Sequence, residues 1–386
     1  MKPAAARGGA TAEATILVST SPGERRVAFW RGGTLEQAFI ERPARPDGVG
    51  DVHLGRVTAR VPALSGVFVA LEGDLSGFLP DAQGGERLTE GTILPLRVTR
   101  AAQGGKGPRL SGTGLPKDLS RDGPPRLLRR GPDAALRLAL AHSRAPLLSD
   151  HPAEAARLRA TLGPDRVRLL AGPAFDEAVE AEFDLLASPE VPLPGGGRLL
   201  VHPTPALIAL DVDTGPAAGR DGGAHRAVNA AALAEAARQI RLRHLAGPIL
   251  LDLAGGSAAS RAALLPALRA AAGPDPLLRV VGLTGLGLME MVRTRIHPPL
   301  HEVLGQPPSP LTQALAALRR AAREAVARPG AALALRAHPR VLAALRGLPG
   351  ALEDFAAGAA HPISFVPDPA LTPGEEVIED AQPHAD

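Results

Sequence analysis

The sequence predicts a multidomain protein of the α/β plus β class, and three patterns indicate this class. In 49–112, short strand-like runs alternate with Gly- and Pro-containing turns, which is typical of a small antiparallel barrel. Two apolar runs, 206–212 and 249–253, flank an amphipathic helix, as in a parallel strand–helix–strand crossover. Helical patterns near the C-terminus, followed by a strand at 361–366, indicate a small α+β domain.

The remaining elements follow from turn signals and hydrophobic periodicity. Pro-Gly and Gly-Gly turns split 14–41 into hairpin-like strands. In the helix expected at 228–245, Leu233, Ala237 and Ile240 share one face, and Gly-Pro follows the helix to end it. Further helices are expected at 261–272, 288–295, 311–328 and 339–347, with a strand at 278–283 and irregular chain at 115–135.

The composition limits the chemistry that the chain can perform. With 45% hydrophobic and 22% charged residues, it is typical of a globular protein. The absence of Cys excludes disulfides, thiolate zinc sites and cysteine nucleophiles. No stretch approaches the ~18 apolar residues of a membrane span, so we expect no membrane partner and a cytoplasmic location. The net charge of +3 permits an anionic partner without requiring one.

Aspartates occur at the ends of the two apolar strands. The two-residue period of a strand puts Asp211 and Asp213 on one face, and Asp252 lies inside the run 249–253. Strands that flank one crossover bring such carboxylates to the same sheet edge, where Mg²⁺ and its phosphate ligands can bind. The pattern therefore favours a metal site. An Asx-turn at Asp213 and a capping role for Asp252 remain open alternatives.

Three rival motifs do not fit the sequence. The Asp-x-Asp pattern is shared with haloacid-dehalogenase-like phosphatases, but their chemistry needs a downstream Lys, and none follows Lys117. Lys106 in GGKG is followed by Gly107 rather than Ser or Thr, so this segment is not a phosphate-binding P-loop. The His residues are scattered and show no HExxH metal-binding pattern.

Several segments resemble the catalytic half of the ribonuclease E/G family. The run GDVHLGRVTARVPALSGVFVALEGDLSGFLP is similar to the family's S1-type RNA-binding barrel, and GKGPRLS to the basic segment that closes it. The runs PTPALIALDVDTG, VNAAALAEAARQIRLRHLAGPILLDL and LTGLGLMEMVRTR follow the family's catalytic subdomain in order and spacing. HPISFVPDP resembles the end of its small C-terminal domain.

The resemblance implies a role for each matched residue. Asp211 and Asp252 would hold a catalytic Mg²⁺, with Mn²⁺ as a substitute, and the products would carry 5′-phosphate and 3′-hydroxyl ends. Phe68 and Phe78 fall where the family stacks an RNA base, although a Phe in a short apolar strand is more often part of a core. Lys106 would contact the RNA backbone. The implied partner is single-stranded RNA.

Four features depart from the family pattern. Asp213, counted here with the catalytic acids, stands where the family carries Asn, so it either binds metal or weakens the site by repulsion. The family's second acid after the strand of Asp252 is replaced by AGGS. The Cys-bearing zinc link is missing, so no structural zinc is expected and any oligomer is not zinc-linked. The stretch 115–194 is too short for the family's full intervening region and lacks the Arg-Thr-Ala-Gly run of the sensor for an RNA 5′-monophosphate.

These inferences give a specific architecture and function. We expect a ribonuclease-H-like subdomain interrupted by an S1/OB-type barrel, then an α/β nuclease core and a small α+β C-terminal domain. The expected activity is Mg²⁺-dependent endonucleolytic hydrolysis of single-stranded RNA, in the processing or decay of rRNA or mRNA. The alternative is a catalytically weak RNA-binding protein that retains the barrel. The expected boundaries are 1–13 for a disordered tail, 14–45 and 115–195 for the two parts of the ribonuclease-H-like subdomain, 46–114 for the barrel, 196–305 for the nuclease core and 306–386 for a linker and the C-terminal domain.

Overall fold

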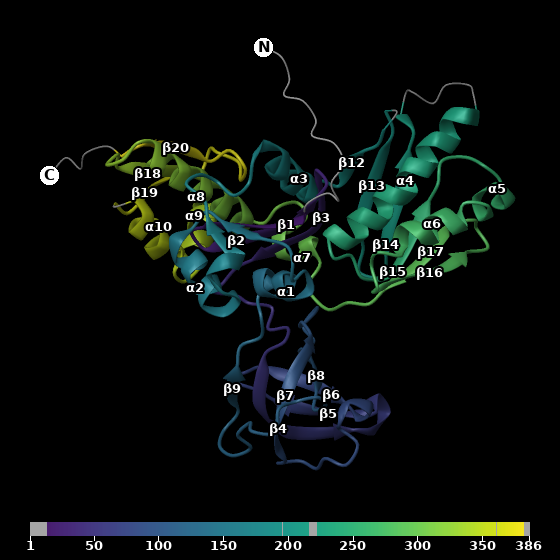
Figure 1. The fold of residues 1–386 in the computed structure, drawn as a ribbon, viewed down its shortest axis with the longest axis horizontal. Coiled ribbons are helices and arrows are strands. Elements are labelled where there is room, and N and C mark those ends of the chain that lie inside the picture. Colours follow the sequence, from purple (N-terminus) through teal and green to yellow (C-terminus); the bar gives the residue numbers. More distant parts are fainter. Residues whose placement is uncertain (1–13, 195, 216–221, 360, 382–386) are drawn as a thin grey trace. The chain divides into compact units, whose positions relative to one another are not determined.

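The structure is a computed structural model that describes residues 14–194, 196–215, 222–359 and 361–381 (Figure 1). The tail expected at 1–13 lies outside these residues. Among the helices in the described ranges, none has both the length and the apolar character needed to span a membrane. The chain divides into two compact units, one drawn from 1–44, 134–185 and 304–386 and the other from 45–133 and 186–303.

The first unit is built on a mixed five-stranded sheet with the order β11-β10-β1-β2-β3. The first three strands form two antiparallel hairpins, as predicted, and β10 and β11 add in parallel beside β1. Gly23 in the first turn has a φ of +75°, and a Cβ there would lie 2.8 Å from Ala351, so only glycine fits. The elements are β1 (Ala14–Ser21), β2 (Glu24–Arg31), β3 (Thr34–Glu41), α1 (Ala134–Ala141), β10 (Leu147–Ser149), α2 (Pro152–Leu162), β11 (Val167–Leu169) and α3 (Glu177–Ala187).

The C-terminal part of the same unit combines helices with a three-stranded sheet of order β19-β18-β20. Ser309 caps the long helix α8 by accepting a hydrogen bond from the Thr312 N–H. Leu315, Leu318 and Val341 are fully buried between α8 and its neighbours. The elements are α8 (Pro310–Ala327), β18 (Leu333–Ala337), α9 (Pro339–Arg346), α10 (Ala351–Ala359), β19 (Ser364–Pro367) and β20 (Val377–Asp380).

The second unit begins with the predicted barrel, a sheet that closes because β5 pairs with both β4 and β6 (Figure 1). All pairings around the barrel are antiparallel except that of β6 with β8, which is parallel. Val57, Leu79 and Leu96 are buried in its core. The strands are β4 (Val52–Val61), β5 (Gly66–Ala70), β6 (Ser76–Pro80), β7 (Ile93–Arg100), β8 (Arg109–Ser111) and an added β9 (Arg126–Arg129), which pairs with β4.

The rest of the second unit is a six-stranded sheet with the order β12-β13-β14-β15-β17-β16. The predicted crossover is confirmed, since β14 and β15 are parallel neighbours joined through α4. Leu233, Ala237 and Ile240 of α4 are all buried, as the predicted amphipathic face requires. The elements are β12 (Glu190–Pro192), β13 (Arg198–Pro203), β14 (Ile208–Asp213), α4 (Gly222–Leu242), β15 (Gly247–Asp252), α5 (Ala258–Ala262), α6 (Leu265–Ala272), β16 (Leu278–Leu283), β17 (Met289–Arg293) and α7 (Leu300–Leu304).

Some predicted elements differ from the structure. The helix expected at 288–295 is wrong, because most of this segment is strand β17. Met289, Met291 and Arg293 are buried and Glu290 and Val292 are only partly buried, so the period is two. Helix α4 ends at Leu242, before the predicted Gly-Pro, because His244 adopts a left-handed φ of 54°. The stretch expected to be irregular at 115–135 contains β9, and the helix expected at 261–272 is two short helices, α5 and α6.

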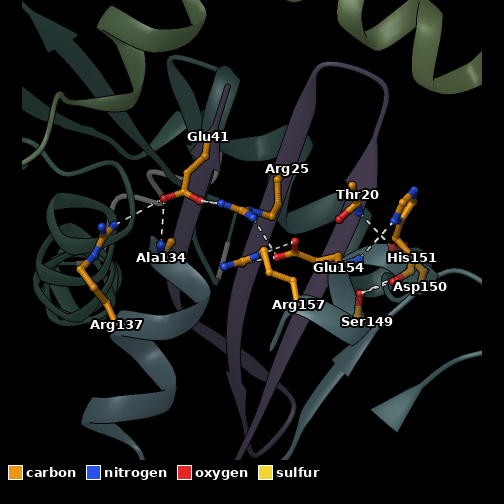
Figure 2. A network of polar contacts seen from close by, with 10 residues as sticks. All are labelled: Thr20, Arg25, Glu41, Ala134, Arg137, Ser149, Asp150, His151, Glu154 and Arg157. Carbon is orange, nitrogen blue, oxygen red and sulfur yellow. Dashed lines mark hydrogen bonds and ion pairs between the residues drawn. The ribbon is translucent and has the colours of Figure 1, made fainter. Parts of the chain in front are cut away.

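An ionic network joins β2, β3 and α2 in the first unit (Figure 2). The Arg25 guanidinium donates to Glu41 at 2.8 Å and to Glu154 at 2.8 Å, and Arg157 also donates to Glu154 at 2.7 Å. The Glu41 carboxylate in turn accepts from the backbone N–H of Ala134 at 2.8 Å. The network thus joins segments that the barrel separates in sequence.

Glu154 should make the first unit sensitive to acid. Burial raises the pKa of this carboxyl, but the hydrogen bond from Arg157 and the charge of Arg25 outweigh burial and lower the pKa below its ordinary value of 4.5. A carboxyl whose pKa is lower in the folded state stabilises that state at pH values above its ordinary pKa. This stabilisation is lost as the pH falls through the folded-state pKa. Hydrogen exchange of the β2 amides should therefore be faster in Glu154→Gln than in wild type at about pH 7, and this difference should narrow at about pH 4. The exposed Glu177→Gln is the control, and a difference for Glu154→Gln that does not change with pH would contradict the prediction.

Candidate functional site

The two candidate metal ligands lie side by side on neighbouring strands. In the parallel pairing of β14 with β15, Asp211 is the register partner of Asp252. Register partners in a sheet lie about 5 Å apart and point to the same face. Because Leu210 and Leu251 are buried, the two aspartates are on the opposite, more open face. The predicted meeting of these carboxylates is therefore present in the fold.

The two carboxylates have different surroundings. In the part of the chain that the structure describes, the exposed Asp211 side chain has no hydrogen-bond or ion-pair partner. Asp252, whose side chain is 50% exposed, accepts a hydrogen bond on one oxygen from Arg261 at 2.8 Å. The Asp211 carboxylate thus has no partner among the described residues, whereas one oxygen of Asp252 is hydrogen-bonded to Arg261.

Asp213 shares the open face with Asp211 but is fully engaged. One oxygen accepts the Gly215 N–H at 2.8 Å, and the other accepts from Arg198 on β13, whose Nη2 lies 2.7 Å away. The hydrogen bond from Gly215, and then that from Arg198, lower the pKa of Asp213 below its ordinary value. The Asx-turn considered from the sequence is therefore present, and both oxygens of Asp213 already have donors.

The donor set decides which cation the acidic pair fits. Across the described ranges, no cluster of three or more His, Cys, Asp or Glu side chains could hold a metal ion. Mg²⁺ binds through one or two carboxylates and fills its other positions with water and substrate phosphate. Two carboxylates, Asp211 and Asp252, on an open face of the sheet fit that requirement.

The loop that follows β15 is held in place from two sides. Asn229 of α4 donates to the Ala254 carbonyl at 2.9 Å and accepts the Ala254 N–H at 3.0 Å. Arg261 donates to the carbonyls of Leu253 and Gly255 at 2.5 and 3.1 Å. The Asp252 end of the strand thus continues into a backbone with fixed geometry rather than a loose loop.

The aromatic pair and Lys106 occupy the barrel. Phe68 on β5 and Phe78 on β6 are register partners, and their rings meet edge to face with centroids 5.6 Å apart. Phe68 is 38% exposed, whereas Phe78 is partly buried and packs across Gly66, where a Cβ would lie 2.5 Å from its ring. The exposed Lys106 lies in a tight turn closed by two backbone hydrogen bonds with Gln103. Phe68 is therefore the ring most available to a ligand.

Three polar residues that contact these acids or the adjoining loop were not predicted from the sequence: Arg198, Asn229 and Arg261. Each acts through a partner that is distant along the chain or on another element. Arg198 could have been found from the strand alternation, because the register of β13 with β14 places it opposite Asp213. Arg261 and Asn229 carry no comparable signal.

The region that contains this site is similar in sequence to a known protein family. The sequence model of the Ribonuclease E/G family matches residues 155–296, which include both Asp211 and Asp252. Ribonuclease G of Escherichia coli strain K12 is 24% identical over 404 aligned positions, covering 75% of this chain and 82% of that protein. A Ribonuclease E/G-like protein, chloroplastic, of Arabidopsis thaliana is 33% identical over 142 residues, which are 35% of this chain and 14% of the relative. Ribonuclease E of Synechocystis is 32% identical over 133 residues, 33% of this chain and 20% of the relative.

The mixed α/β fold has a closed five-stranded barrel and an acidic pair on the open face of its core sheet, and the matched family and relatives give the class, that of an RNA-cleaving enzyme. Residues 155–296 match the ribonuclease E/G family, and the names of the relatives support an endoribonuclease. The location stays a prediction, since the Arabidopsis relative is named as chloroplastic.

The Arg198 contact predicts how Asp213 titrates. Arg198→Ala removes the second cause of the lowered pKa and leaves the first, the Gly215 hydrogen bond, in place. The pKa of Asp213 should therefore rise in this variant but stay below its ordinary value. Carboxyl ¹³C NMR titration of wild type and Arg198→Ala measures it, with the exposed Arg279→Ala as the control. An unchanged pKa of Asp213 would show that Arg198 does not control its charge.

Proposed function

We propose that the chain is a metal-dependent endoribonuclease that hydrolyses phosphodiester bonds in single-stranded RNA, leaving 5′-phosphate and 3′-hydroxyl ends. The observation that carries the proposal is the in-register pairing of Asp211 with Asp252 on the open face of the core sheet. The family relationship supports the same activity. rRNA and mRNA in processing or decay are the proposed substrates.

In this proposal Asp211 and Asp252 hold Mg²⁺, or Mn²⁺ in its place. A bound ion of this kind activates water and stabilises negative charge on a phosphate. The protein's own contribution is to keep two carboxylates at a fixed separation on a rigid sheet. Asp213 contributes through its contacts: with Arg198 and Gly215 as donors, it adds little uncompensated charge beside Asp211. We therefore assign Asp213 a supporting role in the catalytic group rather than that of a metal ligand.

The other parts of the chain have proposed roles that follow from the same resemblance. The barrel would act as an S1-type RNA-binding module, with Phe68 and Phe78 stacking on a base and Lys106 contacting the backbone. The strand order of the first sheet, with three antiparallel strands followed by two parallel ones, is consistent with a ribonuclease-H-like subdomain. The domain boundaries predicted from the sequence stand as part of this proposal.

A second function, a catalytically weak RNA-binding protein, has one observation in its favour. Two of the three acids, Asp213 and Asp252, already accept hydrogen bonds from arginines, which reduces the negative charge available to a cation. The two functions differ in one measurement, because only the nuclease cuts a labelled single strand when Mg²⁺ is added and stops when it is chelated.

Asp252→Asn should reduce the rate of cleavage by at least about 100-fold, because the amide cannot supply a charged oxygen to the cation. RNA affinity measured in EDTA should stay near that of wild type, since the barrel supplies most of the contacts. The matched control is Asp213→Asn, which should keep or raise the activity because an amide oxygen can still accept the Gly215 N–H. Wild-type turnover in Asp252→Asn would refute the assignment, and complete loss in Asp213→Asn would make Asp213 a direct ligand.

Phe68→Ala should weaken binding of a short single strand by ~1–3 kcal/mol if the ring stacks on a base. Its 38% exposure means that the folded barrel should tolerate the change. Leu64→Ala, which removes another exposed apolar side chain of the barrel, is the control and should bind RNA as wild type does. Fluorescence anisotropy and thermal melting on each variant separate binding from folding. A fall in melting temperature without a change in affinity would identify Phe68 as a packing residue.

A further inference from the structure

Arg261 occupies an unusual place beside the candidate metal centre. It belongs to the short helix α5, and its side chain is only 15% exposed. The guanidinium donates to four acceptors: the Asp252 carboxylate at 2.8 Å and the carbonyls of Leu253, Gly255 and Gly287 at 2.5, 3.1 and 3.1 Å. A single side chain therefore joins the end of β15, the loop after it and the turn between β16 and β17.

The partners of Arg261 are themselves held, so the guanidinium has little freedom to move. Asn229 fixes Ala254 in the loop after β15 through both of its backbone groups. In the turn between β16 and β17, the Thr284 hydroxyl accepts the Leu288 N–H at 3.1 Å. The planar guanidinium presents its donors in a fixed geometry that matches such a set of acceptors. Arg261 is consequently a rigid donor aimed at one oxygen of Asp252.

Two opposing effects of Arg261 on a bound cation have to be weighed. Its positive charge repels a divalent ion, which lowers the affinity of the site. Its hydrogen bond restricts the half-exposed Asp252 side chain and engages one oxygen of that carboxylate. The pair of acids still has a net charge of −1 when Arg261 is included, so the site attracts a cation. Hydrogen bonds to metal-ligating carboxylates commonly raise metal affinity by 10- to 100-fold, which favours the second effect.

We propose that Arg261 is a positioning residue that orients the Asp252 carboxylate for divalent cation binding and couples it to the loops on either side. The inference rests on the proposed function, because it takes Asp211 and Asp252 as the metal ligands. It adds to that function a residue that contacts the ligand rather than the cation or the RNA.

The test measures cation binding in the absence of RNA. Arg261→Gln, Arg261→Lys and the control Arg269→Gln are titrated with Mn²⁺ alone, and bound ion is followed by electron paramagnetic resonance. Arg269 lies on the next helix, α6, is exposed, and its side chain has no hydrogen-bond or ion-pair partner among the described residues. Arg261→Gln should raise the Kd for Mn²⁺ and the Mn²⁺ concentration for half-maximal cleavage by about tenfold or more. RNA affinity in EDTA should not change, and Arg269→Gln should match wild type throughout.

The lysine variant separates geometry from charge. An ammonium group keeps the charge but cannot serve all four acceptors, so Arg261→Lys should recover only part of the Mn²⁺ affinity. Full recovery would show that a single donor to Asp252 is sufficient and would overturn the coupling to the loops. An unchanged or lower Kd in Arg261→Gln would overturn the positioning role. Thermal melting identifies any variant that is partly unfolded, and the titrations are run below the melting range of every variant.

Asp211→Asn and Asp252→Asn distinguish the failure of this inference from the failure of the proposed function. If wild type binds Mn²⁺ and both aspartate variants lose it while Arg261→Gln does not, only the positioning role falls. If the aspartate variants bind Mn²⁺ as wild type does, the metal assignment falls and the role of Arg261 falls with it.

Discussion

The candidate site depends on the parallel pairing of β14 with β15. It puts Asp211 directly beside Asp252, about 5 Å apart across two strands whose apolar residues are buried on the other face. Two carboxylates so close repel each other, and the fold tolerates this because the face is open to solvent and because Asp252 has a cationic partner. The crossover through helix α4 is what makes β14 and β15 parallel neighbours and so places these two residues side by side.

Arginines control the charge on the open face of the core sheet. Arg198 compensates Asp213 and Arg261 compensates one oxygen of Asp252, so Asp211 is the acid without a described partner. The same principle operates in the first unit, where Arg25 joins Glu41 to Glu154 and so ties together segments that the barrel separates (Figure 2). Arginine suits both positions because its fork of donors can serve several acceptors at once.

Much of the fold could be predicted because its signals are local. The hairpins of the first sheet, the barrel strands and the amphipathic face of α4 follow from turns and periodicity. The segment 288–295 was predicted wrongly because Leu, Met and Glu are also good helix formers, and pairing with β15 and β16 decides for a strand. The hydrogen bonding of Asp213 could be predicted only in part. The Asx-turn is local and was an open alternative, but Arg198 contacts Asp213 from another strand.

The sequence by itself determined the residue types of the candidate site, the crossover that unites them and the absence of thiol chemistry, because these depend on composition and short-range periodicity. Only the tertiary structure decided which of these acids have partners among the described residues. Arg261 is nine positions beyond Asp252 and reaches it because the loop and helix α5 fold back, with Asn229 and the β16–β17 turn holding that geometry. The charge of a carboxylate site depends on neighbours within a few ångströms, and for this site those neighbours come from separate elements of the fold.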